Sequence, residues 1–288
     1  MNRDIVTVDK QSPGSLQPKR GGKALRVLLA VSLASVLIHM VHATTLDRII
    51  EYSEVLFVSS KVTKAMDGYR IAFVSDIHEL SSDALADLVT ELNNRHLDLL
   101  ILGGDYTSNG LRQRQVLQVL SGVATVDGVF GVEGNHDNRQ SLAADMEASG
   151  VLLLANCGIR VRDGFYLAGV SDYWAHNANI AIATTGASAD DFVLLVSHNP
   201  DVTMVQSSSS VDLILAGHTH GGHITLFGLF APALLPDNIT DYNHRFLGGW
   251  STALDGTPVY VSRGVGKFAN VPRVFARPQV VILTLQRA

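Results

Sequence analysis

The stretch GHTHGGH, residues 217–223, carries three histidines within six residues and has glycines on both sides of them. It follows a short apolar run, 211–216, that is typical of a buried strand, so the histidines lie where a strand ends and the chain turns. His218 and His220 are two residues apart and project to the same side of an extended backbone. Because neutral imidazole is the commonest protein ligand of metals, the stretch indicates either a metal site or a polar turn with surface histidines.

Four more polar clusters share one property with this stretch, because each directly follows an apolar run. In a layered sheet fold the carboxyl ends of strands meet at one edge, where ligands bind. Asp, Asn and His side chains at that edge offer the N and O atoms that suit Mn, Fe, Zn or Mg. Five such strand ends in succession favour one shared metal site over unrelated turns. The clusters are Asp76-x-His78, Gly104-Asp105, Gly134-Asn135-His136-Asp137, Ser197-His198-Asn199 and Gly217-His218-x-His220.

The order of the expected elements indicates the fold class. Alternating strands and helices, followed mostly by strands, predict an α/β fold in which helices flank two packed sheets. The aperiodic stretch 228–245 is expected to be a functional or mobile loop. We expect strands 55–62 and 69–75 to pair with each other, with helices at 82–96 (capped by Ser82), 110–121 and 139–149, and strands at 97–105, 128–137, 158–163, 165–170, 192–197, 211–216, 222–227, 246–250, 258–262 and 279–285.

The N-terminal region differs from the rest of the chain. Residues 1–25 are polar and expected to be disordered, residues 26–45 are hydrophobic, and residues 46–288 form the folded domain. Residues 27–46 carry no formal charge and are just long enough to span a membrane, which favours an anchor. A signal-peptidase pattern at 41–43 leaves a cleaved signal peptide as the alternative. The basic residues ahead of the segment predict a cytoplasmic N-terminus and a domain on the exported, periplasmic or extracellular, side.

Composition excludes several classes of protein and site. The chain has 288 residues, 47% of them hydrophobic, which suffices for one large domain with a full core. Six of the 22 basic and two of the 27 acidic residues lie before residue 44, so the remainder has a net charge near −9. This charge argues against nucleic acid as a partner. Cys157 is the single cysteine, which excludes an internal disulfide and a thiolate metal site.

The order D-x-H, G-D, G-N-H-D, H and G-H-x-H resembles the calcineurin-like metallophosphoesterases, also called purple-acid-phosphatase-like, over residues 69–285. GHTHGG, the SHNPD at 197–201 and the run 262–278 resemble most closely the membrane-associated branch with the UDP-2,3-diacylglucosamine pyrophosphohydrolase-like proteins. The resemblance implies a four-layer αββα sandwich of two mixed sheets, the metallo-dependent phosphatase fold. It also implies hydrolysis of a phosphate ester or pyrophosphate.

The same resemblance implies a site with two divalent metal ions, Mn, Fe, Zn or Mg. The ions would neutralise phosphoryl oxygens and supply hydroxide for in-line attack. His136 would contact the phosphate or protonate the leaving oxygen, and Asp137 would orient it. The implied ligands are Asp76, His78 and His220 for one ion, Asn135, His198 and His218 for the second, and Asp105, which would bridge the ions with its two carboxylate oxygens at ~3.5–4 Å separation.

The expected substrate is an amphiphile that carries phosphate. Apolar stretches at 224–236 and 271–278 adjoin the site and either pack on the sheet or, beside a membrane tether, suit a lipid-linked substrate. Arg263, Lys267 and Arg273 could counter further phosphate charge. The resemblance implies a UDP-2,3-diacylglucosamine-type pyrophosphatase of lipid A biosynthesis, yet that reaction belongs to the cytoplasmic face, which conflicts with the predicted export.

Two alternatives and two local features stay open. A broad phosphodiesterase or phosphatase of soluble substrates such as nucleotides is the first alternative. A metal-free binding scaffold is the second, and it is disfavoured because every ligand position is filled. His223 stands where the branch usually has glutamine, and it either contacts substrate or faces solvent. Residues 172–176 form either a lip over the pocket or a surface loop.

Overall fold

The computed structural model describes residues 21–234, 239–268 and 271–288. The chain forms two compact units, Met1–Ile38 and His39–Ala288. Helix α1 (Gly21–Thr44) begins ahead of the hydrophobic segment expected from residue 26, and the rest of the expected disordered tail lies outside the described residues. The segment Lys23–Arg48 has a mean hydropathy of 2.1 and is long and apolar enough to cross a membrane.

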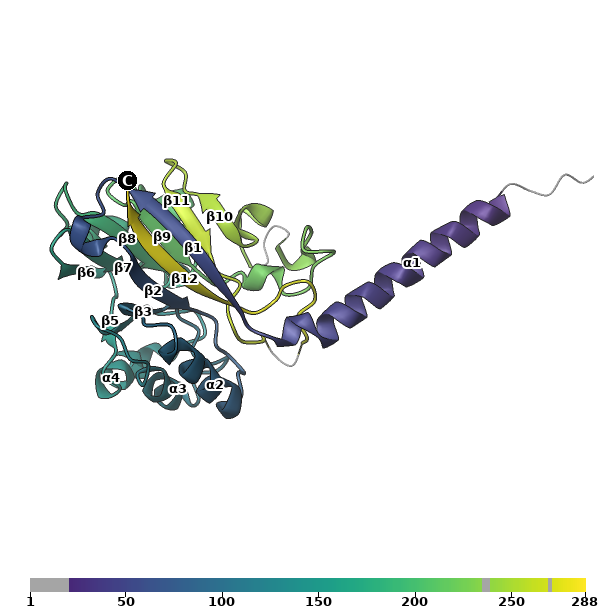
Figure 1. Ribbon diagram of the computed structural model, residues 1–288, viewed down its shortest axis with the longest axis horizontal. Coiled ribbons are helices and arrows are strands. Elements are labelled where there is room, and N and C mark those ends of the chain that lie inside the picture. Colours follow the sequence, from purple (N-terminus) through teal and green to yellow (C-terminus); the bar gives the residue numbers. More distant parts are fainter. Residues whose placement is uncertain (1–20, 235–238, 269–270) are drawn as a thin grey trace, which may run out of the picture. The chain divides into compact units, whose positions relative to one another are not determined.

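Two six-stranded mixed sheets form the body of the second unit (Figure 1). Their strand orders are β1-β12-β2-β3-β4-β5 and β10-β11-β9-β8-β7-β6. The first sheet consists of β1 (Glu51–Ser59), β2 (Tyr69–Val74), β3 (Leu99–Leu102), β4 (Val129–Gly131), β5 (Leu152–Leu153) and β12 (Gln279–Arg287). The second consists of β6 (Cys157–Arg162), β7 (Phe165–Gly169), β8 (Phe192–Ser197), β9 (Leu213–Ala216), β10 (Gly249–Thr252) and β11 (Pro258–Val261). The helices of this unit are α2 (Ser82–Asn93), α3 (Gln113–Leu120), α4 (Arg139–Ala148), α5 (Ile180–Ala183) and α6 (Val202–Val205).

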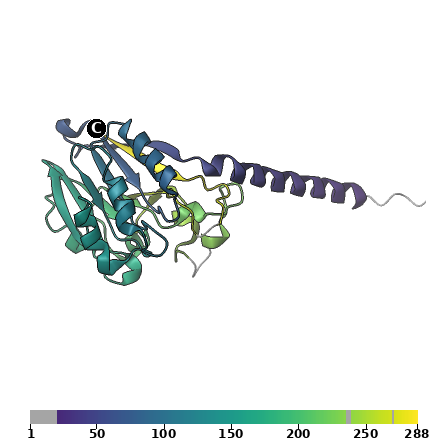
Figure 2. The same cartoon turned by 90° about the horizontal axis from the view of Figure 1, so that it is seen from below.

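The core is layered because side chains alternate between the two faces of each strand. On β2, Phe73 packs between the sheets and Val74 packs outward against α2, α3 and α4, the helical layer that Figure 2 shows from below. On β8, Leu194 packs between the sheets and Leu195 packs outward against α5 and α6. Parallel strands buried on both faces read as continuous apolar runs, as these do. The expected four-layer αββα sandwich is therefore confirmed.

Three local expectations are wrong. Strands β1 and β2 do not pair, because β12 lies between them, parallel to β1 and antiparallel to β2. The expected strand at 222–227 does not form, because positive φ angles at Gly221, Gly222 and His223 turn the backbone. Ile224 and Leu226 form isolated bridges instead. The cap of α2 is Ser81, whose hydroxyl accepts a hydrogen bond from the backbone N–H of Ala84.

Backbone hydrogen bonds join the loops that follow the parallel strands. Ile77, after β2, donates its N–H to the carbonyl of Asp105, after β3, at 2.9 Å. Gly217, after β9, donates to the carbonyl of His198, after β8, also at 2.9 Å. Because β2, β3 and β4 run parallel, as do β7, β8 and β9, their carboxyl ends bring the polar clusters to one edge.

Candidate dinuclear metal centre

A first group of buried side chains gathers at this edge, and its ligand atoms all lie within 4.8 Å of one another. It consists of Asp76, His78, Asp105 and His220. The Nε2 atoms of His78 and His220 are 3.1 Å apart. His220 Nε2 lies 3.4 Å from Asp76 Oδ1, and His78 Nε2 lies 3.4 Å from Asp105 Oδ2. The structure thus brings together the residues expected to hold the first ion.

A second group adjoins the first and shares Asp105 with it. His198 Nε2 lies 3.0 Å from Asn135 Oδ1 and 3.3 Å from Asp105 Oδ2. His218 Nδ1 lies 3.3 Å from the same His198 nitrogen. All seven candidate ligands therefore occupy two adjoining groups that meet at Asp105.

The second group fits a metal ion because of its donor set. His198 Nδ1 lies 2.8 Å from the carbonyl of Gly103, and His218 Nε2 lies 2.9 Å from the carbonyl of Ile239. Each imidazole therefore donates one N–H to the backbone and turns its other nitrogen inward, the arrangement that orients metal-ligating histidines. With neutral imidazoles, as ligation requires, the inward atoms of both histidines, Asn135 and Asp105 are all acceptors. Such a cluster needs a cation, and its N and O atoms suit the divalent metals.

Burial keeps three of the imidazoles neutral. It lowers the pKa of His78 to about 4 and that of His218 to about 3, where the neighbouring His198 adds to the effect. Burial and then the positive charge of Arg273 lower the pKa of His220 as well. Neutral imidazole is the form that binds metals. These three side chains are therefore in the protonation state that metal binding requires.

The charges around Asp105 favour a cation at the centre. Burial opposes the charged form of His198, but the carboxylate of Asp105 raises the pKa of this imidazole well above its ordinary value. Burial likewise opposes the charge of Asp105, and His198 lowers its pKa below the ordinary range. Burial, with Asp105 close by, raises the pKa of Asp76 to about 6. Positive charge is therefore stabilised at this position.

Backbone conformation also marks the site. Left-handed φ is uncommon for residues other than glycine, and such residues concentrate at functional sites. Five candidate ligands adopt it, and no local sequence pattern signals this property. They are Asp76 (54°), His78 (42°), Asp105 (55°), His218 (73°) and His220 (53°).

Asp105 presents one oxygen, rather than two, to both groups. Its Oδ1 accepts a hydrogen bond from the backbone N–H of His136 at 2.8 Å, whereas Oδ2 faces both His78 and His198. A Cβ at Gly134 would lie 2.3 Å from both the backbone N and Oδ1 of Asp105, so this close approach requires glycine. Oδ2 is therefore the oxygen nearest to both groups, and the expected bridge through two carboxylate oxygens stays a prediction.

Asp137 joins backbone segments instead of orienting His136. Its carboxylate accepts hydrogen bonds from the backbone N–H groups of Asp105 (3.0 Å), Tyr106 (2.8 Å) and Gly134 (2.8 Å). The loops after β3 and β4 are thereby held together. The expectation that Asp137 orients the His136 imidazole is replaced by this backbone role.

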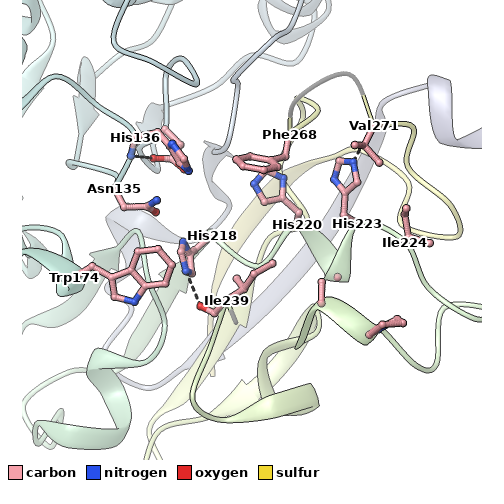
Figure 3. A pocket seen from close by; sticks show the side chains of 14 residues that line it. Asn135, His136, Trp174, His218, His220, His223, Ile224, Ile239, Phe268 and Val271 are labelled. Atoms are coloured by element: carbon pink, nitrogen blue, oxygen red, sulfur yellow. Dashed lines mark hydrogen bonds between the residues drawn. The ribbon is translucent and has the colours of Figure 1, made fainter. Parts of the chain in front are cut away.

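A cavity of about 690 Å³ opens over the candidate ligands (Figure 3). His136 lines it, as expected for a side chain that contacts substrate. Trp174 also lines it, with its ring edge-on to His218 at 4.6 Å, so residues 172–176 contribute a lip. Phe268 and Ile239 come from aperiodic loops, and sequence reasoning missed them. The lining consists of Asp105, Asn135, His136, Trp174, His218, His220, Gly222, His223, Ile224, Pro232, Ala233, Ile239, Phe268 and Val271.

Two basic residues expected to meet phosphate have structural roles instead. Arg273 is fully buried, and its guanidinium donates to the backbone carbonyls of His220, Arg263 and Gly266. Arg263 pairs with Glu51 at 2.6 Å. His223, whose role was left open, is buried in the cavity wall, with Nε2 3.0 Å from the Val271 carbonyl.

A profile described as calcineurin-like phosphoesterase matches residues 69–222. The chain is 30% identical over 238 residues to Phosphodiesterase YaeI of Escherichia coli, covering 75% of this chain and 82% of that protein. It is 26% identical over 229 residues to an uncharacterized metallophosphoesterase of Helicobacter pylori (75% and 59% covered). It is 25% identical over 254 residues to the Danio rerio "transmembrane protein with metallophosphoesterase domain" (79% and 55% covered). The chain thus spans little more than half of the last two relatives.

Buried Asp, Asn and His acceptors in two adjoining groups define the class of site, a candidate dinuclear metal centre. The chain belongs to the calcineurin-like phosphoesterase family, because the matching profile covers more than half of its length. The donor set of its site fits two divalent ions. The resemblance is confirmed for the family, and the narrower UDP-diacylglucosamine branch stays a prediction.

Proposed function

We propose that the enzyme hydrolyses a phosphoester or pyrophosphate bond of a lipid-linked substrate in a membrane or cell envelope, of the UDP-2,3-diacylglucosamine type. The observation that carries this proposal is the cavity lining. Candidate ligands such as His218 and His220 share the cavity with apolar side chains such as Ile224, Ile239 and Phe268. Few polar groups within apolar walls suit a ligand that combines a charged head group with hydrocarbon.

The candidate ligands have distinct roles in this proposal. Two bound divalent ions would supply Lewis-acid stabilisation of the phosphoryl group and activation of water. His136, on the cavity wall, would hold the phosphate or donate a proton to the leaving oxygen. Trp174 and Phe268 would exclude water around the reacting group. Asp76, His78 and His220 would hold one ion, Asn135, His198 and His218 would hold the other, and Asp105 would be shared by both.

Anchoring by α1 is a further part of the proposal. The apolar segment Lys23–Arg48 is long enough to span a bilayer, and the Danio rerio relative carries the name transmembrane protein. The basic residues that precede the segment favour placement of the domain on the exported side. An enzyme so placed would act on an envelope lipid phosphate or pyrophosphate of the same chemical type, because the UDP-2,3-diacylglucosamine reaction itself belongs to the cytoplasmic face.

A soluble phosphodiester is the second candidate substrate. The relative from Escherichia coli is named a phosphodiesterase. Trp174 and Phe268 also offer aromatic rings at the cavity, on which a nucleobase could stack.

The test compares substrates with the full-length chain in detergent and Mn²⁺. Bis-p-nitrophenyl phosphate, p-nitrophenyl phosphate, a cyclic nucleotide and a UDP-linked diacyl sugar are assayed with and without chelator, with Asp105→Asn as the matched inactive control. We expect chelator-sensitive cleavage that is fastest on the UDP-linked lipid. Faster cleavage of the cyclic nucleotide would establish the soluble alternative. Metal binding without turnover of any substrate would contradict both.

A further inference from the structure

The loop that follows His223 exposes apolar side chains that a soluble surface would bury. This apolar loop, residues 224–230, exposes five large hydrophobic residues, and Leu229 is 80% exposed. Contiguous exposed apolar surface marks sites of protein or membrane interaction. The five residues are Ile224, Leu226, Phe227, Leu229 and Phe230.

Most backbone N–H groups of the apolar loop are paired within the protein. Leu226 donates its N–H to the carbonyl of Phe230 at 2.7 Å, and Leu229 donates to that of Leu226 at 3.0 Å. The N–H of Gly228 donates to the Thr225 hydroxyl at 2.8 Å. Unsatisfied backbone groups are costly in a lipid environment. The loop therefore presents hydrocarbon outward while five of its seven N–H groups are paired.

The apolar loop adjoins the point where the apolar segment joins the folded unit. His39, the first residue of that unit, has its ring 4.5 Å from that of Phe227 and 4.8 Å from that of Phe275. His42 stacks on Phe275 at 3.9 Å. Asp47 then accepts the N–H of Phe275 at 2.8 Å. The first residues of the folded unit therefore lie beside the apolar loop.

We propose that the apolar loop inserts into the interfacial layer of the lipid bilayer that α1 spans. The inference rests on the proposed anchoring, and its occupant is a phospholipid surface. Ile224 belongs both to the apolar loop and to the cavity lining, and Val271, 39% exposed, lies at the same wall. Insertion places this wall of the cavity at the membrane, so a lipid substrate enters without crossing bulk water.

The test uses the full-length chain in phosphatidylcholine–phosphatidylglycerol vesicles. In a Cys157→Ser background, a fluorophore on Leu229→Cys is compared with one on Val126→Cys. Val126 is 70% exposed and precedes β4, at the sheet edge opposite the candidate ligands. We expect nitroxide-labelled lipids to quench the probe at residue 229 and to leave that at residue 126 unchanged.

The outcomes separate docking from anchoring. Protein that floats with the vesicles while both probes keep their fluorescence would overturn the docking and leave the anchoring intact. Protein that fails to float would overturn both. A second variant, Leu229→Glu, is expected to keep its rate on bis-p-nitrophenyl phosphate and to lose rate on a vesicle-embedded substrate, whereas Val126→Glu should change neither. Equal rates of Leu229→Glu and wild type on the embedded substrate would also contradict the docking.

Discussion

The Asp137→Asn substitution tests how the two strand-end loops are held together. One oxygen of this buried carboxylate accepts the N–H groups of Asp105 and Gly134, and the other accepts that of Tyr106. Asparagine can supply only one of these acceptors. If the asparagine oxygen accepts the first two hydrogen bonds, the asparagine NH2 group faces the Tyr106 N–H. Two hydrogen-bond donors then oppose each other.

The expected loss of stability follows from these hydrogen bonds. Burial and the nearby Asp105 raise the pKa of Asp137, whereas its backbone N–H donors oppose that rise and favour the charged carboxylate. A hydrogen bond to a charged acceptor contributes about 1.5–3 kcal/mol, and a buried donor left unsatisfied costs about 1–3 kcal/mol. We therefore expect Asp137→Asn to lower the free energy of unfolding by about 3 kcal/mol. Because the backbone of Asp105 shifts with the loop, kcat should fall too.

Urea unfolding in the presence of chelator measures the effect, since bound metal would add its own stabilisation. The matched control is Asp163→Asn in the exposed turn between β6 and β7, expected to change stability by less than about 0.5 kcal/mol. An Asp137→Asn protein that unfolds at the wild-type urea midpoint, yet shows a shifted pH profile of kcat, would refute the backbone role. It would restore the view that Asp137 orients His136.

Three further predictions concern the centre and an outlying carboxylate. Asp105→Asn should abolish activity and reduce bound metal from two ions to one or none, measured by elemental mass spectrometry; wild-type activity with two ions bound would exclude a bridging role. His136→Ala should keep both ions and lose about 10²–10⁴-fold in kcat, and loss of metal would make it a ligand. Burial raises the pKa of Asp255, but hydrogen bonds from Thr257 and Ser208 lower this pKa to about 2. Because this folded value lies below the unfolded one, about 3.9, the stabilisation is present above about pH 4 and is lost as the pH falls through 2. Asp255→Asn should accordingly lower the urea midpoint at neutral pH, with a difference from wild type that shrinks in acid; a constant difference would contradict the assignment.

The candidate ligands could be found from sequence because their signal is local. Strands such as β3 and β9 are buried on both faces, so each is a short unbroken apolar run. The polar residues directly after such runs, Asp105 and His218 among them, must then lie at the carboxyl edge. Parallel pairing brings the carboxyl ends of neighbouring strands together. Polar clusters that each follow an apolar run therefore predict one shared site.

Features that depend on distant partners could not be found in this way. The register of β12 joins Leu283 to Ile71 and Gln279 to Glu51, and nothing local in either strand signals these partners. Phe268 and Ile239 reach the cavity from loops without periodicity. The role of Asp137 depends on where three backbone N–H groups lie, and sequence carries no information about that.

The position of β12 between β1 and β2 has a consequence for biogenesis. The first sheet cannot close until the residues of β12 have left the ribosome, because its second strand from the edge comes last in the chain. About 230 residues separate β1 from β12, which at ~5–20 residues per second corresponds to roughly 10–50 s of synthesis. During that interval the domain stays incomplete and can be threaded as an extended chain. A strand order that delays folding thus keeps the nascent protein competent for translocation, as the export and anchoring proposed above would require.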